Sequence, residues 1–273
     1  MDSRKLERIL LLILLLLNVF LLAVVLSDSA QARRSNAETV AALAAMLEEN
    51  GITARDGAIR ILPAPAKCTL TRNMAQEQRF MTQMIGANQI IDQGGNIYYY
   101  SGPKGQAVLR GSGEMDTLFE NGAVSWRGGT ERTALRLLKN CGVRAVAVQD
   151  TKKETDVALL NPTLDGIPVY NATLRFQFLE GRLYMLTGTR IFDSMEKQES
   201  DGLMDSVSVL IRFMEIVRNE GYICSRIESL SPGYIQAVTR SGVAELTPVW
   251  RIETDAGALM IDADSGKTES RLS

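Results

Sequence analysis

Residues Ile9 to Leu26 read ILLLILLLLNVFLLAVVL, an apolar stretch with Asn18 as its one strongly polar residue, and this stretch sets the layout of the whole chain. No charged residue lies between Arg8 and Asp28. At about 1.5 Å per residue, this stretch would form a helix roughly 27 Å long, close to the ~30 Å hydrocarbon core of a bilayer. A water-soluble helix is seldom apolar on every face, because such a helix needs partners all around it. The stretch therefore predicts a transmembrane helix over residues 9–26.

Two fates are open to this segment. The basic residues Arg4, Lys5 and Arg8 precede it and a small-x-small tripeptide ending at Ala32 follows it, which is the arrangement of a cleavable signal peptide. The apolar stretch is longer than the ~7–15 residues of a usual signal-peptide core, which favours retention as an anchor. A short tail ahead of a large domain is the usual layout of a signal anchor. We therefore expect a single-pass protein of the cell membrane, with its N-terminus in the cytoplasm and its bulk outside.

The composition of the chain is that of a globular protein. Apolar residues make up 45% and charged residues 23% of the sequence, and the formal net charge of −2 argues against a nucleic-acid partner. The chain has no histidine, which excludes Ser-His-Asp and Cys-His catalysis and HExxH zinc sites. Cys68, Cys141 and Cys224 are widely spaced and form no CxxC motif. At most one pair of them can bond, and small core residues are the expected role.

Three segments share a helical pattern that ends in glycine. Apolar residues recur at helical spacing before Gly51, Gly142 and Gly221, and an apolar residue follows each glycine. Glycine at this place favours a left-handed helix end that leads directly into a strand. Residues 35–38 (SNAE) fit a capping box with the serine as N-cap. A polar–apolar pattern over residues 74–85 predicts a further helix.

Hairpin signals follow the helices. They are residues 97–101 and 106–111 around a Gly-Pro-Lys-Gly turn, residues 170–190 with a tight turn at Glu180-Gly181, and the strand segments 234–239, 246–254 and 258–262. Helices followed by antiparallel strands, repeated, predict an α+β fold with a helix laid on each of two sheets.

The expected organisation has five segments, with a domain boundary at the break Gly128-Gly129. They are a cytoplasmic tail (1–8), a transmembrane anchor (9–26), a juxtamembrane linker (27–35), a first extracytoplasmic α+β domain (36–127) and a second one (128–273).

Two kinds of pattern could carry chemistry. Residues 101–104 and 194–197 both fit S-x-x-K, the nucleophile motif of penicillin-recognising enzymes, but no K-T-G or S-D-N accompanies them. Asp262, Asp264 and Glu269 could contribute to a cation site, although acidic residues around a turn are usually a solvated edge. We therefore expect no catalytic residue, cofactor or metal, and binding becomes the expected class of function.

Both ends of the chain carry a family resemblance. The N-terminal sequence MDSRKLERILLLILLLLNVFLLAVVL, with an Asn before Phe-Leu-Leu, resembles the start of YycI-type regulatory proteins of Gram-positive bacteria. Residues 248–252 (PVWRI) and 259–267 (LMIDADSGK) are similar to the closing hairpin of PepSY-like domains, where a Pro-x-Trp strand leads to a D-A-x-S/T-G turn. The resemblance implies that both α+β units are PepSY- or cystatin-like.

The resemblance also implies a function and partners. Proteins of this kind are non-enzymatic and act with a sister protein, YycH, on WalK, the sensor histidine kinase of a cell-wall two-component system. Contacts with the kinase would run partly through the membrane, where Asn18 and Phe20 are the expected interaction residues. Asn18 is the one side chain in the span that can both donate and accept a hydrogen bond between helices. An exported PepSY-like inhibitor or chaperone of a peptidase is the alternative, and the sign of regulation stays open.

Overall fold

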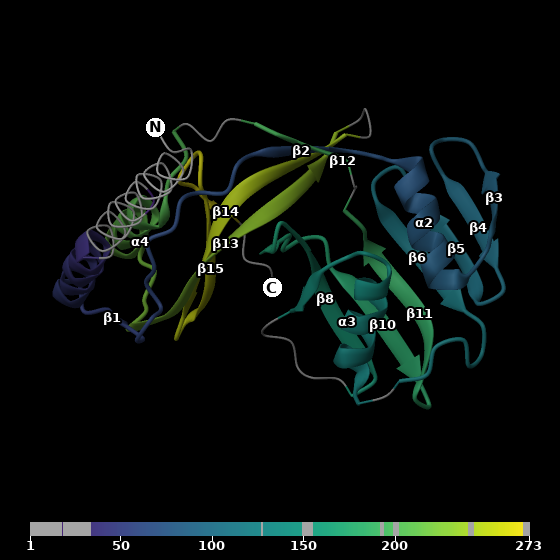
Figure 1. Cartoon of the computed structure of the whole chain (residues 1–273). Coiled ribbons are helices and arrows are strands. Elements are labelled where there is room, and N and C mark those ends of the chain that lie inside the picture. Colours follow the sequence, from purple (N-terminus) through teal and green to yellow (C-terminus); the bar gives the residue numbers. More distant parts are fainter. Residues whose placement is uncertain are drawn as a thin grey trace, which may run out of the picture.

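The computed structural model describes residues 18, 34–126, 128–148, 155–191, 194–198, 202–239 and 243–269 of the chain. Within these residues the expected α+β class is confirmed, because helices pack on two large and mostly antiparallel sheets (Figure 1). Apart from Asn18, the predicted transmembrane segment lies outside the described residues. Among the residues described, no helix combines the length and the apolar character needed to cross a membrane.

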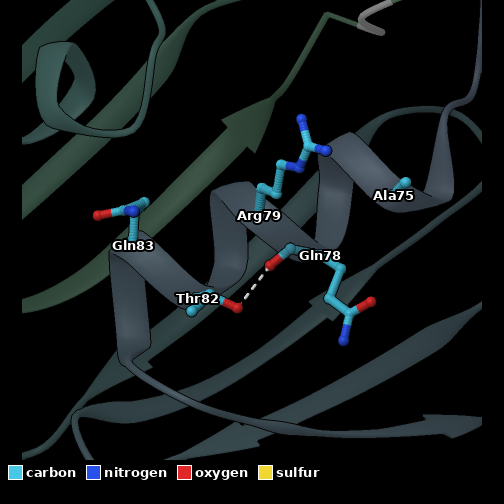
Figure 2. Close-up of a pocket in the computed structure, with 5 residues that line it drawn as sticks. All are labelled: Ala75, Gln78, Arg79, Thr82 and Gln83. Carbon is cyan, nitrogen blue, oxygen red and sulfur yellow. Dashed lines mark hydrogen bonds between the residues drawn. The ribbon is translucent and has the colours of Figure 1, made fainter.

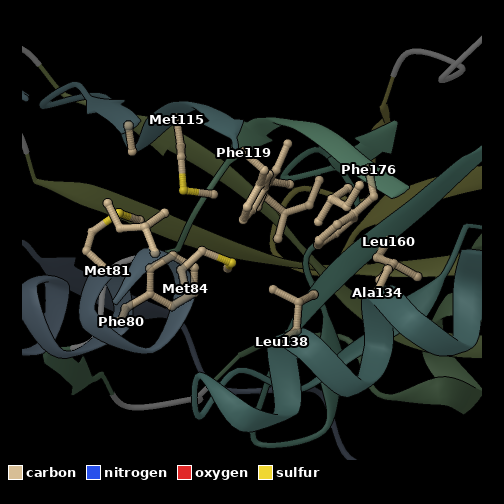
Figure 3. Close-up of a cluster of buried hydrophobic side chains, with 14 of the residues drawn as sticks. Phe80, Met81, Met84, Met115, Phe119, Ala134, Leu138, Leu160 and Phe176 are labelled. Atoms are coloured by element: carbon tan, nitrogen blue, oxygen red, sulfur yellow. The ribbon is translucent and has the colours of Figure 1, made fainter. Parts of the chain in front are cut away.

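The larger sheet is formed between residues 89 and 189 and has the strand order β3-β4-β5-β6-β11-β10-β8-β7, with β9 paired to β8. Its strands are β3 (Gln89–Asp92), β4 (Tyr98–Gly102), β5 (Gly105–Leu109), β6 (Glu114–Phe119), β7 (Ala145–Ala147), β8 (Val157–Leu164), β9 (Ile167–Pro168), β10 (Leu174–Leu179) and β11 (Arg182–Thr189). Two helices, α2 (Met74–Ile85) and α3 (Thr130–Asn140), pack on one face and share a single apolar core. Figure 3 shows Phe80 and Met84 of α2 and Leu138 of α3 in that core.

This sheet consists of two similar halves joined edge to edge. In each half a helix precedes a meander of three strands, α2 before β4-β5-β6 and α3 before β8-β10-β11. The last strand of each half meets the other in antiparallel pairing, with Leu118 opposite Met185 and Asp116 opposite Thr187. The halves are therefore related by an approximate two-fold axis between β6 and β11.

The smaller sheet has seven strands in the order β1-β13-β14-β15-β16, and β2 pairs with both β14 and β12. The strands are β1 (Thr53–Ala54), β2 (Cys68–Thr71), β12 (Ser194–Lys197), β13 (Arg226–Val238), β14 (Ala244–Thr254), β15 (Gly257–Asp262) and β16 (Thr268–Glu269). The N-terminal helix (residues 34–49) and α4 (Ser206–Glu220) pack on it around Trp250 and Phe213, both fully buried. Here too a helix precedes a three-stranded meander, β13-β14-β15.

Strand pairing does not follow the expected division into 36–127 and 128–273. The nine-stranded sheet continues across residue 127, while β1 and β2 from the first range join the sheet of the second. The chain enters the larger sheet after β2 and returns before β12, and these two strands pair with each other. The larger sheet is thus an inserted lobe (residues 72–190), and the described residues of 34–71 and 191–269 form a discontinuous lobe. Independent unfolding of any unit stays a prediction.

The predicted left-handed helix ends are confirmed at all three glycines, although after Gly221 the next strand, β13, begins only at Arg226. Gly51, Gly142 and Gly221 have φ values of 74°, 79° and 72°, which place all three in the left-handed region. The N-terminal helix and α3 end with the same pair of backbone bonds, Gly51 N to Glu48 O with Ile52 N to Leu47 O, and Gly142 N to Lys139 O with Val143 N to Leu138 O. The expected capping role of Ser35 is wrong, because residue 34 is already helical and Ser35 lies within the helix.

Candidate interaction surfaces

The predicted membrane contacts cannot be placed in the fold. Asn18 is described alone, as an exposed helical residue, and Phe20 lies outside the described residues. Their role in binding a kinase helix therefore stays a prediction.

The residues of the two S-x-x-K segments make structural contacts. Ser101 lies within β4, opposite Gln106, and not at a helix start. Lys197 forms an ion pair of 2.6 Å with Asp165, and this hydrogen bond raises the pKa of Lys197. A lysine that acts as a base needs a lowered pKa, so the contact opposes that role. Ser194 Oγ accepts a hydrogen bond of 3.1 Å from Asn73 Nδ2.

The acidic C-terminal turn is also held by protein contacts. Asp262 Oδ1 accepts the backbone N–H groups of Asp264 and Ser265 at 2.7 and 2.8 Å. Asp264 forms an ion pair of 2.7 Å with Lys67. Within the described ranges, no group of three or more acidic or cysteine side chains could hold a metal ion.

The three cysteines behave as packing residues. All are free; Cys68 is buried, whereas Cys141 and Cys224 are half-buried. Burial raises the pKa of each thiol, that of Cys141 to about 12. Thiols with raised pKa values are poor nucleophiles near neutral pH, which fits the expected role in the core.

A buried ion pair lies at the start of the inserted lobe, and no pattern in the sequence predicted it. Arg72 donates to both carboxylate oxygens of Glu77 at 2.7 Å, and the two side chains are only 8% and 1% exposed. Tyr100 donates to the same carboxylate at 2.5 Å. Burial and the hydrogen bond to Glu77 raise the pKa of Tyr100, so its hydroxyl remains a donor. The pattern Arg-x₄-Glu gave no signal, because both residue types usually lie on the surface.

Further contacts fix both crossings between the lobes. Arg72 Nη1 donates to the backbone and side-chain oxygens of Asn96 at 2.8 and 2.9 Å, and its guanidinium lies 4.7 Å from the centre of the Tyr98 ring. At the return crossing, the buried Arg190 lies 4.9 Å from the centre of the Phe80 ring. An arginine, Arg72 or Arg190, thus attaches each crossing segment to the inserted lobe, which indicates a structural role for both residues.

A cleft of about 260 Å³ lies between the two lobes. It is lined by Val146, Ala147, Val148, Asn161, Pro168, Tyr170, Ser229, Ser231, Arg251 and Glu253. Its polar groups already bind one another: Arg251 contacts Glu253 at 3.2 Å, and Ser229 Oγ donates to Glu253 at 3.0 Å. The Tyr170 ring lies against Arg251, 5.4 Å from its guanidinium carbon. The cleft is therefore small and its charges are paired.

A second hollow, about 310 Å³, lies along the outer face of α2 (Figure 2). Gln78, Arg79 and Gln83 are exposed and extend away from the helix (Figure 2), and Thr82 Oγ1 donates to the Gln78 carbonyl at 2.8 Å. Ala75 completes the lining. Since a single helix supplies every lining residue, this is an open surface and not an enclosed site.

Another open surface is the face of the nine-stranded sheet opposite α2 and α3. Residues directly opposite each other in antiparallel strands share a face, so the register defines two rows that cross seven strands. One row is Ile91, Tyr99, Val108, Asp116, Thr187, Arg175 and Leu159, and the other is Gln89, Ser101, Gln106, Leu118, Met185, Gln177 and Val157. We call these fourteen residues the open face. Leu118 at its centre is 56% exposed, and the neighbouring Tyr184 is 40% exposed.

Sequence comparison identifies no relative, since no protein-family model and no curated protein matches the chain. Solved structures are similar at low identity. An uncharacterized protein from Eubacterium rectale has a TM-score of 0.47 and 11% identity, covering 81% of this chain and 90% of its own. The C-terminal domain of Bacillus megaterium YpeB has a TM-score of 0.38 and 9% identity, with coverages of 74% and 96%. Bacillus subtilis YycH has a TM-score of 0.36 and 10% identity over 74% of this chain and 54% of YycH.

Proposed function

We propose that this chain is a membrane-anchored, non-enzymatic regulator that acts through protein–protein contacts on a WalK-like sensor histidine kinase, together with a YycH-like sister protein. The observation that carries the proposal is the open face. It is broad and mixed apolar and polar, and both Leu118 at its centre and the adjacent Tyr184 are exposed. Exposed apolar patches rimmed by polar residues are typical of protein-binding surfaces.

The apolar stretch at residues 9–26 supports the membrane part of the proposal. Within lipid, helices associate through close packing and interhelical hydrogen bonds, because the hydrophobic effect contributes little there. Asn18 can supply such a bond, whereas Phe20, two residues on, would lie on the opposite side of the helix and pack against another neighbour. The anchor would hold the extracytoplasmic lobes next to the kinase at the membrane surface.

The test compares three full-length proteins in membranes: the wild type, Asn18→Leu, and a version whose residues 9–26 are replaced by an unrelated signal anchor. Loss of one interhelical bond of ~1 kcal/mol should lower association with the kinase about five-fold in Asn18→Leu. Insertion should not suffer, because leucine inserts better than asparagine. Normal binding and regulation by the swapped-anchor version would refute contact through the span.

The alternative, an exported peptidase inhibitor or chaperone, predicts a different result. Its activity would survive in a soluble fragment that lacks residues 9–26, whereas the proposed regulator requires them. Peptidase inhibition by that fragment, without any effect on the kinase, would favour the alternative.

A further inference from the structure

We propose that β3 is a self-association edge, through which two copies of this chain join their nine-stranded sheets into one. β3 ends the strand order, and none of the described residues forms a strand beside its outer edge. Figure 1 places it at the far end of the inserted lobe, away from α4. All four of its residues are exposed, including Ile90 at 38% and Ile91 at 52%. An exposed apolar edge strand is a template for pairing with another strand.

The free hydrogen-bonding groups of β3 follow from its pairing with β4. Gln93 N donates to Ile97 O at 3.0 Å, and the register places Ile91 opposite Tyr99. In an antiparallel ladder the bonded pairs alternate, so the odd-numbered residues turn their N–H and C=O groups toward β4. The N–H and C=O groups of Ile90 and Asp92 therefore point outward, where they can accept a new strand.

The edge is complementary to itself in one antiparallel register. With a two-fold axis at Ile90, this residue meets Ile90 of the other copy, and Gln89 meets Ile91. Asn88 then faces Asp92, so the two aspartates are kept apart. Apolar side chains that meet directly across strands stabilise pairing. With the axis at Ile91 instead, each Asp92 would face an Ile90, which leaves the carboxylate against an apolar side chain.

The other strand edges are poorer candidates. The unpaired middle part of the β13 edge contains Pro232, which has no N–H to donate, and the free edge of β12 carries Glu196 and Lys197. β7, at the opposite end of the inserted lobe, has three residues and one exposed apolar side chain, Val146.

The chain already contains the geometry that the proposal requires. Inside the inserted lobe, two helix-and-meander halves join by antiparallel pairing of β6 and β11, with both helices on one face. Pairing β3 with its copy would repeat this joint, again with the helices of both copies on one face. A second copy of the chain is therefore the occupant that fits.

Cross-linking in membranes without the kinase tests the proposal, so its outcome does not depend on the proposed function. The native cysteines are replaced by alanine in the full-length chain, and Ile90→Cys or Val146→Cys is added before treatment with a short bismaleimide. Val146 is the matched control, because it is similarly exposed, at 42%, on the other terminal strand. Linked dimer should form with Ile90→Cys and not with Val146→Cys. Equal yields from both positions, or linkage of Ile90→Cys to another protein only, would overturn the proposal.

A second pair of variants tests the backbone bonds. In the Ile90→Cys chain, Asp92→Ala keeps the outward N–H, whereas Asp92→Pro removes it and spares the bonds to β4. Because the two-fold axis places the substitution in both copies, Asp92→Pro removes two hydrogen bonds from the dimer. Dimer formation should therefore fall roughly tenfold for the proline variant relative to the alanine variant. Equal yields from two folded variants, as judged by their circular dichroism, would contradict strand pairing.

Discussion

The two sheets are built from the same unit, a helix followed by three antiparallel strands, yet they are covered to different extents. The seven-stranded sheet has two helices on one face, and the segment around Tyr170 covers part of the other. The nine-stranded sheet also has two helices on one face, but its other face remains open, with Leu118 56% exposed. The same unit therefore builds a closed lobe, whose sheet is covered on both faces, and an open lobe, whose sheet is covered on one face.

The largest expected effects concern the interior of the open lobe. Glu77→Ala leaves Arg72 as an uncompensated buried charge, which should lower the free energy of unfolding by about 3–5 kcal/mol. Urea unfolding of the full-length protein in detergent measures this change in the free energy of unfolding. The triple variant Arg72→Met/Glu77→Leu/Tyr100→Phe is the control, because it removes both charges and the Tyr100 hydroxyl together and should cost less than the single change. A loss below about 1 kcal/mol for Glu77→Ala would mean that the ion pair does not hold this lobe.

A smaller effect is expected where the lobes meet. A Cβ atom on Gly233 would lie 2.0 Å from the Tyr170 ring, which packs on this glycine and covers the seven-stranded sheet. Gly233→Ala should therefore displace the ring and lower the free energy of unfolding by about 1–3 kcal/mol. Limited proteolysis should also become faster at the crossings near residues 72 and 190. In a chain that already carries Tyr170→Ala, Gly233→Ala should lower the free energy of unfolding much less. An equal loss in both backgrounds would exclude the Tyr170 ring as the cause.

The sequence predicted the local parts of this fold. Helix-ending glycines and tight turns depend on a few neighbouring residues, so Gly142 and the turn at Glu180-Gly181 could be identified; Glu180 has a φ of 50° and Gly181 of 75°. The insertion could not be predicted in this way. It depends on β2 pairing with β12, and the intervening chain contains a complete lobe. The choice of sheet partners is decided by tertiary packing and leaves no local pattern.

The candidate surface was harder to predict than the fold. The alternation of Leu174, Phe176 and Phe178 showed that one face of the hairpin is buried, but not that the other face would stay open over seven strands. The buried Arg72 and Glu77 carry the sequence signature of a solvated surface. A charged residue in the sequence does not reveal whether it is buried or exposed, and here only the packing of α2 onto β4 decides that Arg72 and Glu77 are buried.

The smallest expected change in stability separates the two faces of one strand. Leu118 and Phe119 are neighbours on β6, 56% and 9% exposed, and they point to the open face and to the core. Leu118→Ala should change the free energy of unfolding by less than about 0.5 kcal/mol, because little of its side chain is buried. Phe119→Ala should cost about 3–5 kcal/mol by opening a cavity. Urea unfolding of the two variants gives both values.

Binding then shows whether the open face is an interface. If the kinase or its sister protein contacts this face, Leu118→Ala should weaken complex formation roughly tenfold while the fold stays intact, as expected for a central apolar contact. Lys104 lies in the β4–β5 turn, away from both rows, so Lys104→Ala is the matched exposed control. Unchanged binding by Leu118→Ala would mean that exposure alone does not mark the contact, and recognition would have to lie in the membrane segment or on the closed lobe.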